Sequence, residues 1–299
     1  MTVDTLHAPL DLGDVLAPIG VERFFADHWQ RRMLALDIDQ ASFSRVKNEI
    51  GPLDIARLAG LAKGGTQAWI ANEHLAHSMI PVDATNAADF FALGATLYFL
   101  NVPLERLTAG VAAFLGAPRQ RIIASIFLTP ASGGASVHFD MHENFTVQLT
   151  GAKRWHVGAA PCVAAPTEGY ILGQRLPLSM AGAGTIKEDT PNTVDLRPGS
   201  LLYVPRGTQH RTEAGEQSWS VNLSYYRTMW LDILEDGLKR RLAGSAKWRG
   251  TVTGLGNQCP PAAQIQNILP GLMTELREIL ADPRELENFC RDFLDRSGN

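Results

Sequence analysis

The sequence predicts a mostly β protein, a sandwich or small barrel with helices at both ends. Residues 91–228 contain several short strand-like runs that are separated by Gly or Pro. The flanking regions, residues 1–90 and 229–299, contain apolar residues at helical spacing. A hydrophobic fraction of 45% and a charged fraction of 19% over 299 residues are typical of a globular chain with a substantial core.

The first region, residues 1–90, is expected to be mixed helical and to pack on the barrel. "GVERFFADHWQRRMLAL" (20–36) carries apolar residues near helical spacing. "PLDIARLAGLAKGG" (52–65) predicts a helix that two glycines end. His74 and His77 are three residues apart, and we interpret them as part of a polar turn, because nothing else in the sequence indicates a second site.

The middle and last regions differ in their periodicity. Residues 91–228 include one expected helix, "LERLTAGVAAFLG" (104–116), among expected strands. These are "TLYFL" (96–100), "RIIASIFLTP" (121–130), "NFTVQLTGAKRWHV" (144–157), "GSLLYVP" (199–205) and "SWSVNLSYY" (218–226). Residues 229–299 return to helix, in "MWLDILEDGLKRRLAG" (229–244) and "ILPGLMTELREILADPRELENFCRDFL" (268–294), which a Gly-rich link separates.

Charge and cysteine spacing disfavour several classes of function. A formal net charge of -4 disfavours nucleic acid or anionic lipid as the main partner. The three cysteines, Cys162, Cys259 and Cys290, are far apart and form no CxxC pair, which disfavours a disulfide framework or a zinc ribbon. No apolar stretch is long enough for a membrane helix, and the acidic N-terminus does not resemble a signal peptide. We therefore expect a cytoplasmic protein.

The stretch "SVHFDMHENFTVQLTGAKRWHV" (136–157) raises the question of a metal site. From residue 137 to residue 149, even positions are polar and odd positions are apolar except Glu143, which predicts one strand with two different faces. His138 and Asp140 lie together on the polar face. A single HxD pair is weak support for a metal, because such pairs arise often by chance.

A second stretch strengthens the metal interpretation. In "RPGSLLYVPRGTQHRTE" (197–213), a Pro and a Gly set a tight turn after a short strand, and His210 follows at the start of the next strand. This P-x-G-x-x-H arrangement resembles the second motif of the cupin barrels, whose histidine completes a metal site. His138, Asp140 and His210 together would form a 2-His-1-carboxylate set, which leaves open positions on a non-haem Fe(II) ion.

The chain resembles the JmjC-type 2-oxoglutarate oxygenases, in particular a bacterial cupin-like group that includes ribosomal-protein hydroxylases and is related to the asparaginyl hydroxylases. The resemblance rests on residues 127–157, on "PGSLLYVPRGTQH" (198–210), on "SVNLSYY" (220–226) and, more diffusely, on "FFADHWQRRMLAL" (24–36). It implies a double-stranded β-helix barrel of the cupin or jelly-roll type. It also implies Fe(II) as cofactor, 2-oxoglutarate as cosubstrate, and O2 as oxidant.

The resemblance also implies which residues hold the cosubstrate. Lys153, just past the turn after the HxD strand, matches the basic residue that binds the distal carboxylate of 2-oxoglutarate. Arg154 would point to the opposite face and is the second choice. Asn144 and Asn222 match positions that hydrogen-bond 2-oxoglutarate near the iron, and Thr129 is a further candidate for the same pocket.

The sequence departs from the family pattern at two positions. Phe127 stands where many relatives carry a tyrosine, and Ala135 stands where a hydroxyl residue often helps to hold the cosubstrate. The distal carboxylate would therefore have fewer partners than usual. His142 is unusual, and both a substrate-facing role and a supporting or solvent-facing role are open from the sequence.

The implied reaction is hydroxylation of an unactivated C–H, with succinate and CO2 as co-products. By family analogy the substrate is a side chain of a protein or peptide. The alternatives are a small molecule or peptide natural product as substrate, a demethylase, or a non-enzymatic cupin-like metal-binding protein. The Gly-, Ala- and Pro-rich segment 158–196 is expected to form a rim or lid. In related ribosomal oxygenases a helical dimerisation region precedes a winged helix. Residues 229–299 can hold the former but hardly both, so we expect a homodimer through these helices, with any winged helix reduced or absent.

Overall fold

The computed structural model describes residues 10–70, 78–180, 192–250 and 261–297. The chain divides into two compact units, Met1–Arg227 and Thr228–Asn299. The predicted third region begins close to this division. The division of the chain into three separate domains stays a prediction.

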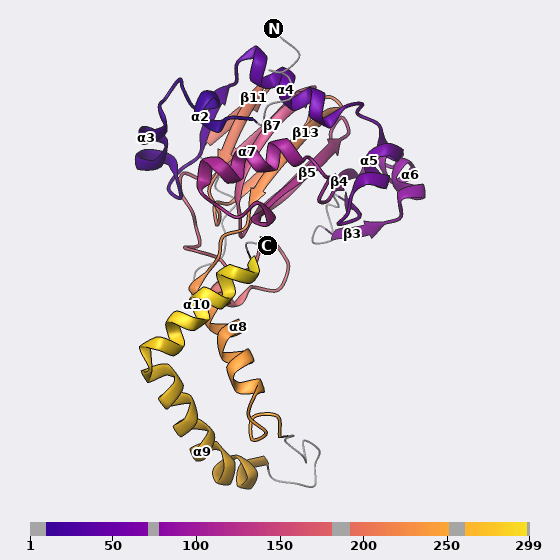
Figure 1. The fold of residues 1–299 in the computed structure, drawn as a ribbon. Helices are drawn as coiled ribbons and strands as arrows, with labels where there is room; N and C mark the ends of the chain where they lie inside the picture. Colours follow the sequence, from indigo (N-terminus) through magenta and orange to yellow (C-terminus); the bar gives the residue numbers. More distant parts are fainter. Residues whose placement is uncertain (1–9, 71–77, 181–191, 251–260, 298–299) are drawn as a thin grey trace. The chain divides into compact units, whose positions relative to one another are not determined.

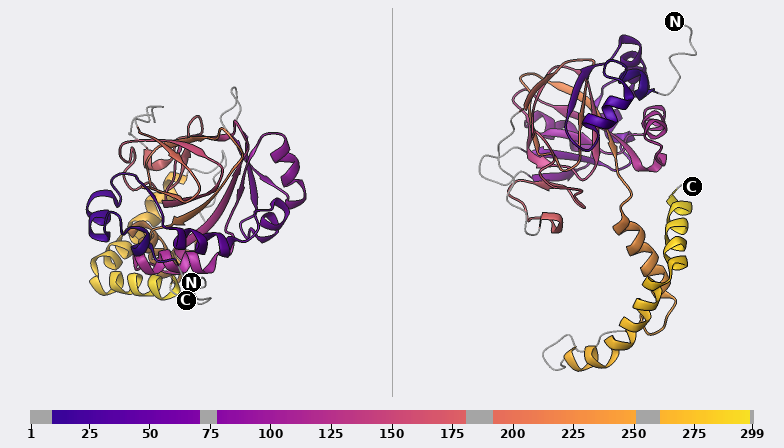
Figure 2. Two further views of the ribbon diagram at one scale, coloured as in Figure 1. Left: turned by 90° about the horizontal axis from the view of Figure 1, so that it is seen from above. Right: turned by 90° about the vertical axis from the view of Figure 1, so that its left-hand side faces the viewer.

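The first unit contains two antiparallel sheets that face each other (Figure 2). Within the described residues, the larger sheet has eight strands in the order β1 (Leu34–Asp37), β11 (Ser200–Val204), β7 (Glu143–Thr150), β13 (Ser218–Tyr225), β5 (Ile122–Thr129), β4 (Thr96–Phe99), β2 (Thr66–Ile70) and β3 (Ser78–Val82). The smaller sheet has five, in the order β10 (Asn192–Leu196), β8 (Lys153–Val157), β12 (His210–Glu213), β6 (Gly134–Phe139) and β9 (Tyr170–Ile171). The predicted mostly β class with a double-stranded barrel is confirmed.

Helices cover the outer face of the larger sheet, where α4 and α7 lie across its strands (Figure 1). Among the described residues of this unit, the α-helices are α2 (Leu12–Val15), α3 (Val21–Arg23), α4 (Gln40–Ile50), α5 (Ile55–Leu61), α6 (Ala87–Ala92) and α7 (Glu105–Leu115). They are joined by the π-helix η1 (Phe24–His28) and by short 3-10 helices η2 (Ala84–Asn86), η3 (Arg119–Arg121) and η4 (Leu178–Met180). Asp39 and Asp54 cap the N-termini of α4 and α5: the Asp39 carboxylate accepts two backbone N–H groups of the first turn and the Asp54 carboxylate accepts one.

Strands β7 and β13 have one apolar and one polar face, and both faces are buried. The apolar side chains join the main core beneath α7, and they are Phe145, Val147, Leu149, Trp219, Val221 and Leu223. The polar side chains between them face the smaller sheet, and they are Asn144, Thr146, Gln148, Ser220, Asn222 and Ser224. Buried polar groups need partners or a ligand. The alternation seen in the sequence therefore describes the wall of an interior cavity.

The predicted single strand over residues 137–149 is wrong. β6 ends at Phe139 in the smaller sheet, and β7 begins at Glu143 in the larger one. The intervening residues carry the chain from one sheet to the other, and the side-chain alternation continues on both sides of this crossing. Periodicity alone cannot reveal such a break, because the strand pairings that create it are made with distant segments.

The predicted helix over residues 20–36 forms only in its first half. The helical backbone of α3 and η1 ends at His28, and Gln30 has a left-handed φ of 59°. Leu34–Asp37 is instead the edge strand β1, because it pairs with β11. With β2 and β3, the described part of residues 1–90 contributes three strands to the larger sheet. The helices predicted at 52–65 and 104–116 are confirmed as α5 and α7.

The second unit consists, in its described residues, of three helices: α8 (Trp230–Ala243), α9 (Pro261–Ala281) and α10 (Pro283–Ser297). They share a small core of Ile233, Ile279 and Phe289. Gly237 allows α8 and α10 to approach closely, since a Cβ there would lie 2.3 Å from the ring of Phe289. None of the helices in the described part of the chain has the length and apolar character needed to span a bilayer.

Candidate active site

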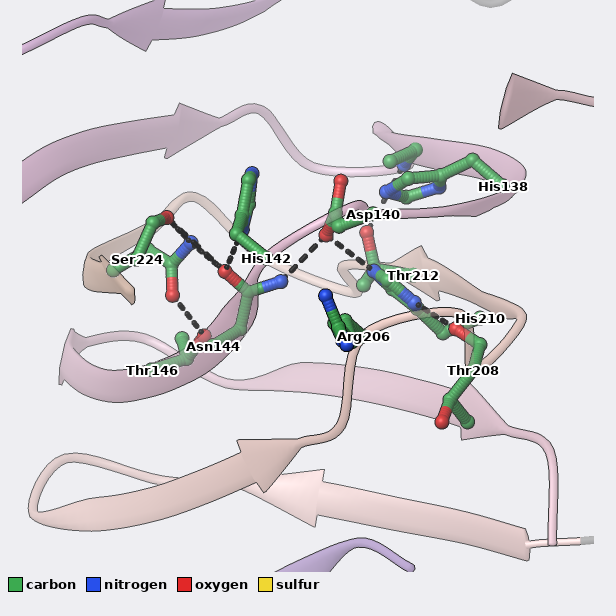
Figure 3. Close-up of polar contacts among 12 residues, drawn as sticks. His138, Asp140, His142, Asn144, Thr146, Arg206, Thr208, His210, Thr212 and Ser224 are labelled. Carbon is green, nitrogen blue, oxygen red and sulfur yellow. Dashed lines mark hydrogen bonds and ion pairs between the residues drawn. The ribbon is translucent and has the colours of Figure 1, made fainter. Parts of the chain in front are cut away.

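His138, Asp140 and His210 converge at the end of the smaller sheet, as Figure 3 shows. His138 lies on β6, Asp140 follows that strand, and His210 begins β12 directly opposite His138 in the antiparallel register. One ligand atom from each residue lies within 4.8 Å of the others. Asp140 Oδ2 is 3.6 Å from His210 Nε2, and the two imidazole centroids are 4.1 Å apart. This spacing suits three ligands of one ion.

Backbone carbonyls orient both histidines toward the shared space. The Nδ1 of His138 is 2.7 Å from the carbonyl oxygen of Ser136, and the Nδ1 of His210 is 3.0 Å from that of Thr208 (Figure 3). Because a carbonyl can only accept, each Nδ1 carries the proton and donates it. In the neutral imidazole each Nε2 then keeps a free lone pair, which is the form that binds a metal, and the Nε2 of His210 is 3.6 Å from Asp140 Oδ2.

The electrostatics of the cluster favour a neutral imidazole at His210 and a carboxylate at Asp140. Burial, followed by the neighbouring His138, lowers the pKa of His210 to about 4. Burial raises the pKa of Asp140, but the nearby imidazoles and a hydrogen bond from Asn144 outweigh burial and lower this pKa. Ligand groups must be deprotonated to bind a cation. The donor set therefore fits a divalent metal such as Fe(II).

An aromatic ring packs against each of the two histidines. Trp155 stacks on His210 with centroids 5.4 Å apart and an interplanar angle of 22°, and Trp69 packs on His138 at 5.1 Å. These indoles also reduce the access of water to the ligand atoms, which strengthens the interactions within the site. The sequence did not indicate Trp69 as part of the site, because it lies on β2, outside the strands that carry the motifs.

The turn in the P-x-G-x-x-H motif joins the two halves of the metal site. Gly207 donates its backbone N–H to the carbonyl oxygen of Asp140 at 2.8 Å. Its own carbonyl accepts the N–H of Cys162 at 2.8 Å. Gly207 has a φ of 74°, and a Cβ there would lie 2.0 Å from the carbonyl oxygen of Val163. Glycine is therefore required both by the backbone conformation and by the close packing.

A cavity of about 290 Å³ opens beside the three ligands. Both sheets line it, and its walls include Trp69, Met79, Thr96, Tyr98, Phe127, Thr129, Ala135, His138, Asp140, His142, Asn144, Thr146, Lys153, Trp155, Tyr170, Ile171, Gln174, His210, Thr212, Ser220 and Asn222. Ile171 and Gln174 belong to the predicted rim segment 158–196, of which residues 181–191 lie outside the described residues. His74 and His77 lie outside them as well.

Lys153 is the one lysine among the described residues that line this cavity, and only 4% of it is exposed. Its Nζ donates to Ser220 Oγ at 3.2 Å and lies 5.7 Å from the centre of the Phe127 ring. In the described part of the chain, no carboxylate forms an ion pair with it. Burial lowers the pKa of Lys153 to about 7. A buried amine without a counter-charge is the arrangement expected of a binding place for an anionic ligand group.

Arg154, the second choice for this role, points away from the cavity. Its guanidinium forms a two-pronged ion pair with Asp195 at 2.7 and 3.0 Å on the exposed side of β8. The alternation of side chains along a strand separates the two neighbouring cations. Thr129 lies on the cavity wall with its buried Oγ1 lacking any hydrogen-bond partner among the described residues, so its hydroxyl is free to bind a ligand.

Asn144 and Asn222 also line the cavity, but their amides are engaged in a network. Asn144 Nδ2 donates to Asp140 Oδ2 at 2.5 Å, and its Oδ1 accepts from Asn222 Nδ2 at 2.8 Å and from Ser224 Oγ at 3.1 Å (Figure 3). Asn222 Oδ1 accepts from Thr146 Oγ1 at 3.1 Å. Asn144 thus orients Asp140, and Asn222 in turn holds Asn144; both amides also line the cavity predicted to bind 2-oxoglutarate.

Two further cavity residues escaped the sequence interpretation. Ser220, the partner of Lys153, was detectable as a polar residue in phase with Asn222 in "SWSVNLSYY". Tyr98 of β4 stacks on Phe127 with centroids 4.2 Å apart and an interplanar angle of 8°. A tyrosine therefore lines this wall from the neighbouring strand, next to the phenylalanine that departs from the family pattern. Ala135 lies on the same cavity and brings no hydroxyl.

The chain is similar to several known proteins. Residues 104–233 match the JmjC domain family. The chain is 24% identical to the uncharacterized protein YxbC of Bacillus subtilis (strain 168), over 80% of this chain and 77% of that protein. It is 25% identical to the ribosomal protein uL16 3-hydroxylase of Escherichia coli (strain K12), over 92% of this chain and 71% of that protein.

A solved structure of YcfD, a ribosomal oxygenase from Escherichia coli, in complex with cobalt and 2-oxoglutarate, has the same fold. The TM-score is 0.55 at 21% identity, over 91% of this chain and 70% of that one. The chain spans only a third to a half of the longer animal relatives named NO66 and ribosomal oxygenase 2. The family match shows a JmjC domain over residues 104–233, and the two facing sheets agree with the double-stranded barrel expected of such a domain.

Proposed function

We propose that this protein is an Fe(II)- and 2-oxoglutarate-dependent dioxygenase that hydroxylates an unactivated C–H on a side chain of a protein or peptide. One observation carries the proposal: a 2-His-1-carboxylate set shares a single cavity with a buried lysine that lacks a counter-charge among the described residues. The first feature suits a ferrous ion with open positions, and the second suits the distal carboxylate of a dicarboxylic cosubstrate.

The residues of the chain have separate tasks in this proposal. His138, Asp140 and His210 would hold the metal through two neutral Nε2 atoms and a carboxylate oxygen. When bound, ferrous iron, 2-oxoglutarate and O2 supply the oxidising power for C–H hydroxylation, with succinate and CO2 as co-products. Lys153 would bind the distal carboxylate, with Ser220 and the free hydroxyl of Thr129 beside it. No side chain is needed as a separate general base.

A protein substrate is supported by the relatives. The Escherichia coli relative is named for hydroxylation of ribosomal protein uL16, and animal relatives are named ribosomal oxygenases. A ribosomal protein is therefore the substrate class that we propose, with a cytoplasmic location. The cysteines in the described residues, Cys162 and Cys290, are both free, which agrees with a reducing compartment.

The test is turnover of 2-oxoglutarate in the absence of substrate. The purified protein with Fe(II) is expected to release CO2 from 2-oxoglutarate at a low but measurable rate. Asp140→Ala and His210→Ala are expected to lose this activity at least ~100-fold, because each removes a ligand from a set of three. Succinate formation and iron content measure the result. Equal turnover in all three proteins, or none in the wild type, would contradict the proposal and favour a non-enzymatic binding protein.

We also propose that the second unit forms a homodimer. Its helices keep large apolar side chains exposed although they share a small core. The exposed set is Trp230, Leu231, Leu234, Ile268, Leu269, Leu280 and Leu294, with exposed fractions from 37% to 75%. A second copy of the chain would bury these side chains in a symmetric, self-complementary interface.

Sedimentation equilibrium tests the dimer. The wild type is expected to have twice the monomer mass at micromolar concentration, whereas the double variant Ile268→Glu, Leu269→Glu is expected to be monomeric, because a dimer would bury two unpaired carboxylates from each protomer. Leu93→Glu is the matched control, since Leu93 is 84% exposed on the first unit. A monomeric wild type, or a dimer that resists the double substitution, rejects this interface.

A further inference from the structure

Glu143 is the one charged residue among the odd-numbered, otherwise apolar positions from 137 to 149, and the proposed function gives it no task. It is the first residue of β7, three residues after Asp140, and it is fully buried. Phe145 and Val147, the next residues in phase along the strand, belong to the main core. A buried carboxylate at such a position needs partners.

The Glu143 carboxylate makes its hydrogen bonds through one oxygen. Oε2 accepts from the hydroxyl of Tyr203 at 2.7 Å and from the backbone N–H of Arg206 at 3.3 Å. The Tyr203 hydroxyl itself accepts the backbone N–H of Gln30 at 2.9 Å, so its own proton is left for Glu143. Through this oxygen the start of β7 is bonded to β11 and to the turn that follows β11.

The other carboxylate oxygen faces two guanidinium groups at longer range. Oε1 is 3.9 Å from Arg206 Nε and 3.9 Å from Arg227 Nη1. Neither Oε1 of Glu143 nor Nη1 of Arg227 has a hydrogen-bond partner among the described residues. The two arginines therefore compensate the buried charge, whereas the shorter contacts of Oε2 fix the direction of the carboxylate.

The turn that Glu143 contacts is the one that leads to His210, with Arg206 at its start (Figure 3). The next residue, Gly207, donates its backbone N–H to the carbonyl oxygen of Asp140 at 2.8 Å. Two successive amides of the turn are thus held, one by the backbone of Asp140 and the other by the side chain of Glu143. Both contacts join the segment that carries one metal ligand to the segment that carries another.

Stability alone is a poor explanation of this buried carboxylate. Taking charges out of water costs free energy that their mutual attraction often only balances, so an apolar side chain is commonly as stabilising in such a place. A carboxylate adds a directed contact that an apolar side chain cannot make. Groups that orient the ligands of a metal without touching it typically change metal affinity about 10–100-fold.

We propose that Glu143 is a positioning residue of the metal site. Through Oε2 it holds the backbone of Arg206, and it thereby fixes the turn that places His210 beside Asp140. Glu143 is not among the described residues that line the cavity, so it acts through the turn and not on a ligand. This inference rests on the proposed function only in requiring a metal at these three ligands.

The test is the binding of Co(II) to the purified full chain. Glu143→Leu removes the acceptor, whereas Glu143→Gln removes the charge but keeps an oxygen that can accept from Tyr203 and Arg206. Calorimetric titration gives the dissociation constant, at a temperature where circular dichroism shows each variant to be folded. The visible absorption spectrum of the bound Co(II) is a second readout, because it depends on coordination geometry.

Glu143→Leu is expected to weaken Co(II) binding about tenfold or more and to change the absorption spectrum. Glu143→Gln is expected to bind Co(II) within about threefold of the wild type, although it loses stability because the two arginines lose their counter-charge. This separation of metal affinity from stability is what a purely structural role of Glu143 would not produce.

The leucine variant is expected to fold, because the side chains of Arg206 and Arg227 are 13% and 28% exposed and can turn to solvent. If it does not fold, Tyr203→Phe decides in its place. That variant removes the hydroxyl that directs Oε2 of Glu143, and it is expected to weaken Co(II) binding about threefold.

Glu49 on α4 provides the matched control. Its largely buried carboxylate likewise accepts two backbone N–H groups, those of Arg106 and Leu107 at the start of α7, and pairs with the guanidinium of Arg106 at 3.7 Å. Glu49→Leu is expected to lower the stability and to keep the Co(II) affinity and spectrum of the wild type.

Wild-type Co(II) affinity in Glu143→Leu, or in Tyr203→Phe where that variant decides, would overturn the assignment. So would an equal loss of affinity in Glu49→Leu, or a glutamine variant that binds as weakly as the leucine variant. When the wild type binds Co(II) and turns over 2-oxoglutarate, these results reject the role of Glu143 alone. A wild type that binds no Co(II) removes the metal site, and the proposed function fails with it.

Discussion

Replacing Lys153 with methionine is expected to stabilise the ligand-free protein and to abolish its response to 2-oxoglutarate. The buried amine has no carboxylate partner among the described residues, and burial lowers its pKa from 10.5 to about 7. At neutral pH this group costs folding free energy that an apolar side chain of similar length would not. The expected gain in the free energy of unfolding is on the order of 2 kcal/mol.

The lowered pKa of Lys153 determines the sign with which its contribution to the free energy of unfolding changes with pH. Because the pKa in the folded state lies below the value of 10.5, the folded chain binds fewer protons than the unfolded chain between about pH 7 and 10.5. The contribution of Lys153 to the free energy of unfolding therefore rises with pH across this window. The stability advantage of Lys153→Met should be largest below pH 7 and should shrink as the pH approaches 10.5. Thermal unfolding of both proteins across this range measures it.

Although Lys153→Met should stabilise the ligand-free protein, it should remove the stabilisation that 2-oxoglutarate gives the wild type. The wild type with a divalent metal is expected to be stabilised by 2-oxoglutarate, and its affinity should fall by up to about tenfold per pH unit above about pH 7, because binding requires the charged amine. Lys153→Met should show neither effect.

Arg154→Met is the matched control for these measurements, since Arg154 faces outward and pairs with Asp195. A methionine variant at position 153 that is less stable than the wild type at neutral pH, or one that still binds 2-oxoglutarate with wild-type affinity, contradicts the assigned role of Lys153.

Gly207→Ala is expected to have the second large effect, a loss of stability. The added Cβ would meet the carbonyl oxygen of Val163 at 2.0 Å, in a residue whose φ of 74° already disfavours a side chain. The turn cannot move freely, because Gly207 is bonded to Asp140 through its N–H and to Cys162 through its carbonyl. We expect a loss of roughly 2–4 kcal/mol in the free energy of unfolding.

This substitution should also weaken metal binding, because the turn that it strains places His210 and holds the backbone of Asp140. Calorimetric titration with cobalt(II), at a temperature where the variant is still folded, measures this separately from stability. Gly215→Ala provides the comparison, since no atom lies within 4 Å of the position that a Cβ would take there and its φ is not left-handed. Similar losses in the two variants would show that the close packing at Gly207 is not what matters.

Much of the site could be predicted from short-range pattern. The HxD spacing, the turn before His210 and the lysine after the next hairpin are local features, and each places its side chain by strand alternation or turn geometry. For the same reason the polar face of residues 137–149 was identified correctly although the strand itself is interrupted. Alternation depends only on neighbouring residues, and it persists when the chain crosses between sheets.

By itself, the amino-acid order determined which side chains can face the interior and which chemical groups they bring: two imidazoles, a carboxylate and an amine. Only the tertiary structure decided how these groups are used. It set His210 opposite His138 through the register of β12 against β6, and it turned Asn144 toward Asp140. It also left the buried Oγ1 of Thr129 without a hydrogen-bond partner among the described residues. The physical reason is that hydrogen-bond partners and charge neighbours come from strands far apart in the chain, and no local pattern specifies which of them will meet.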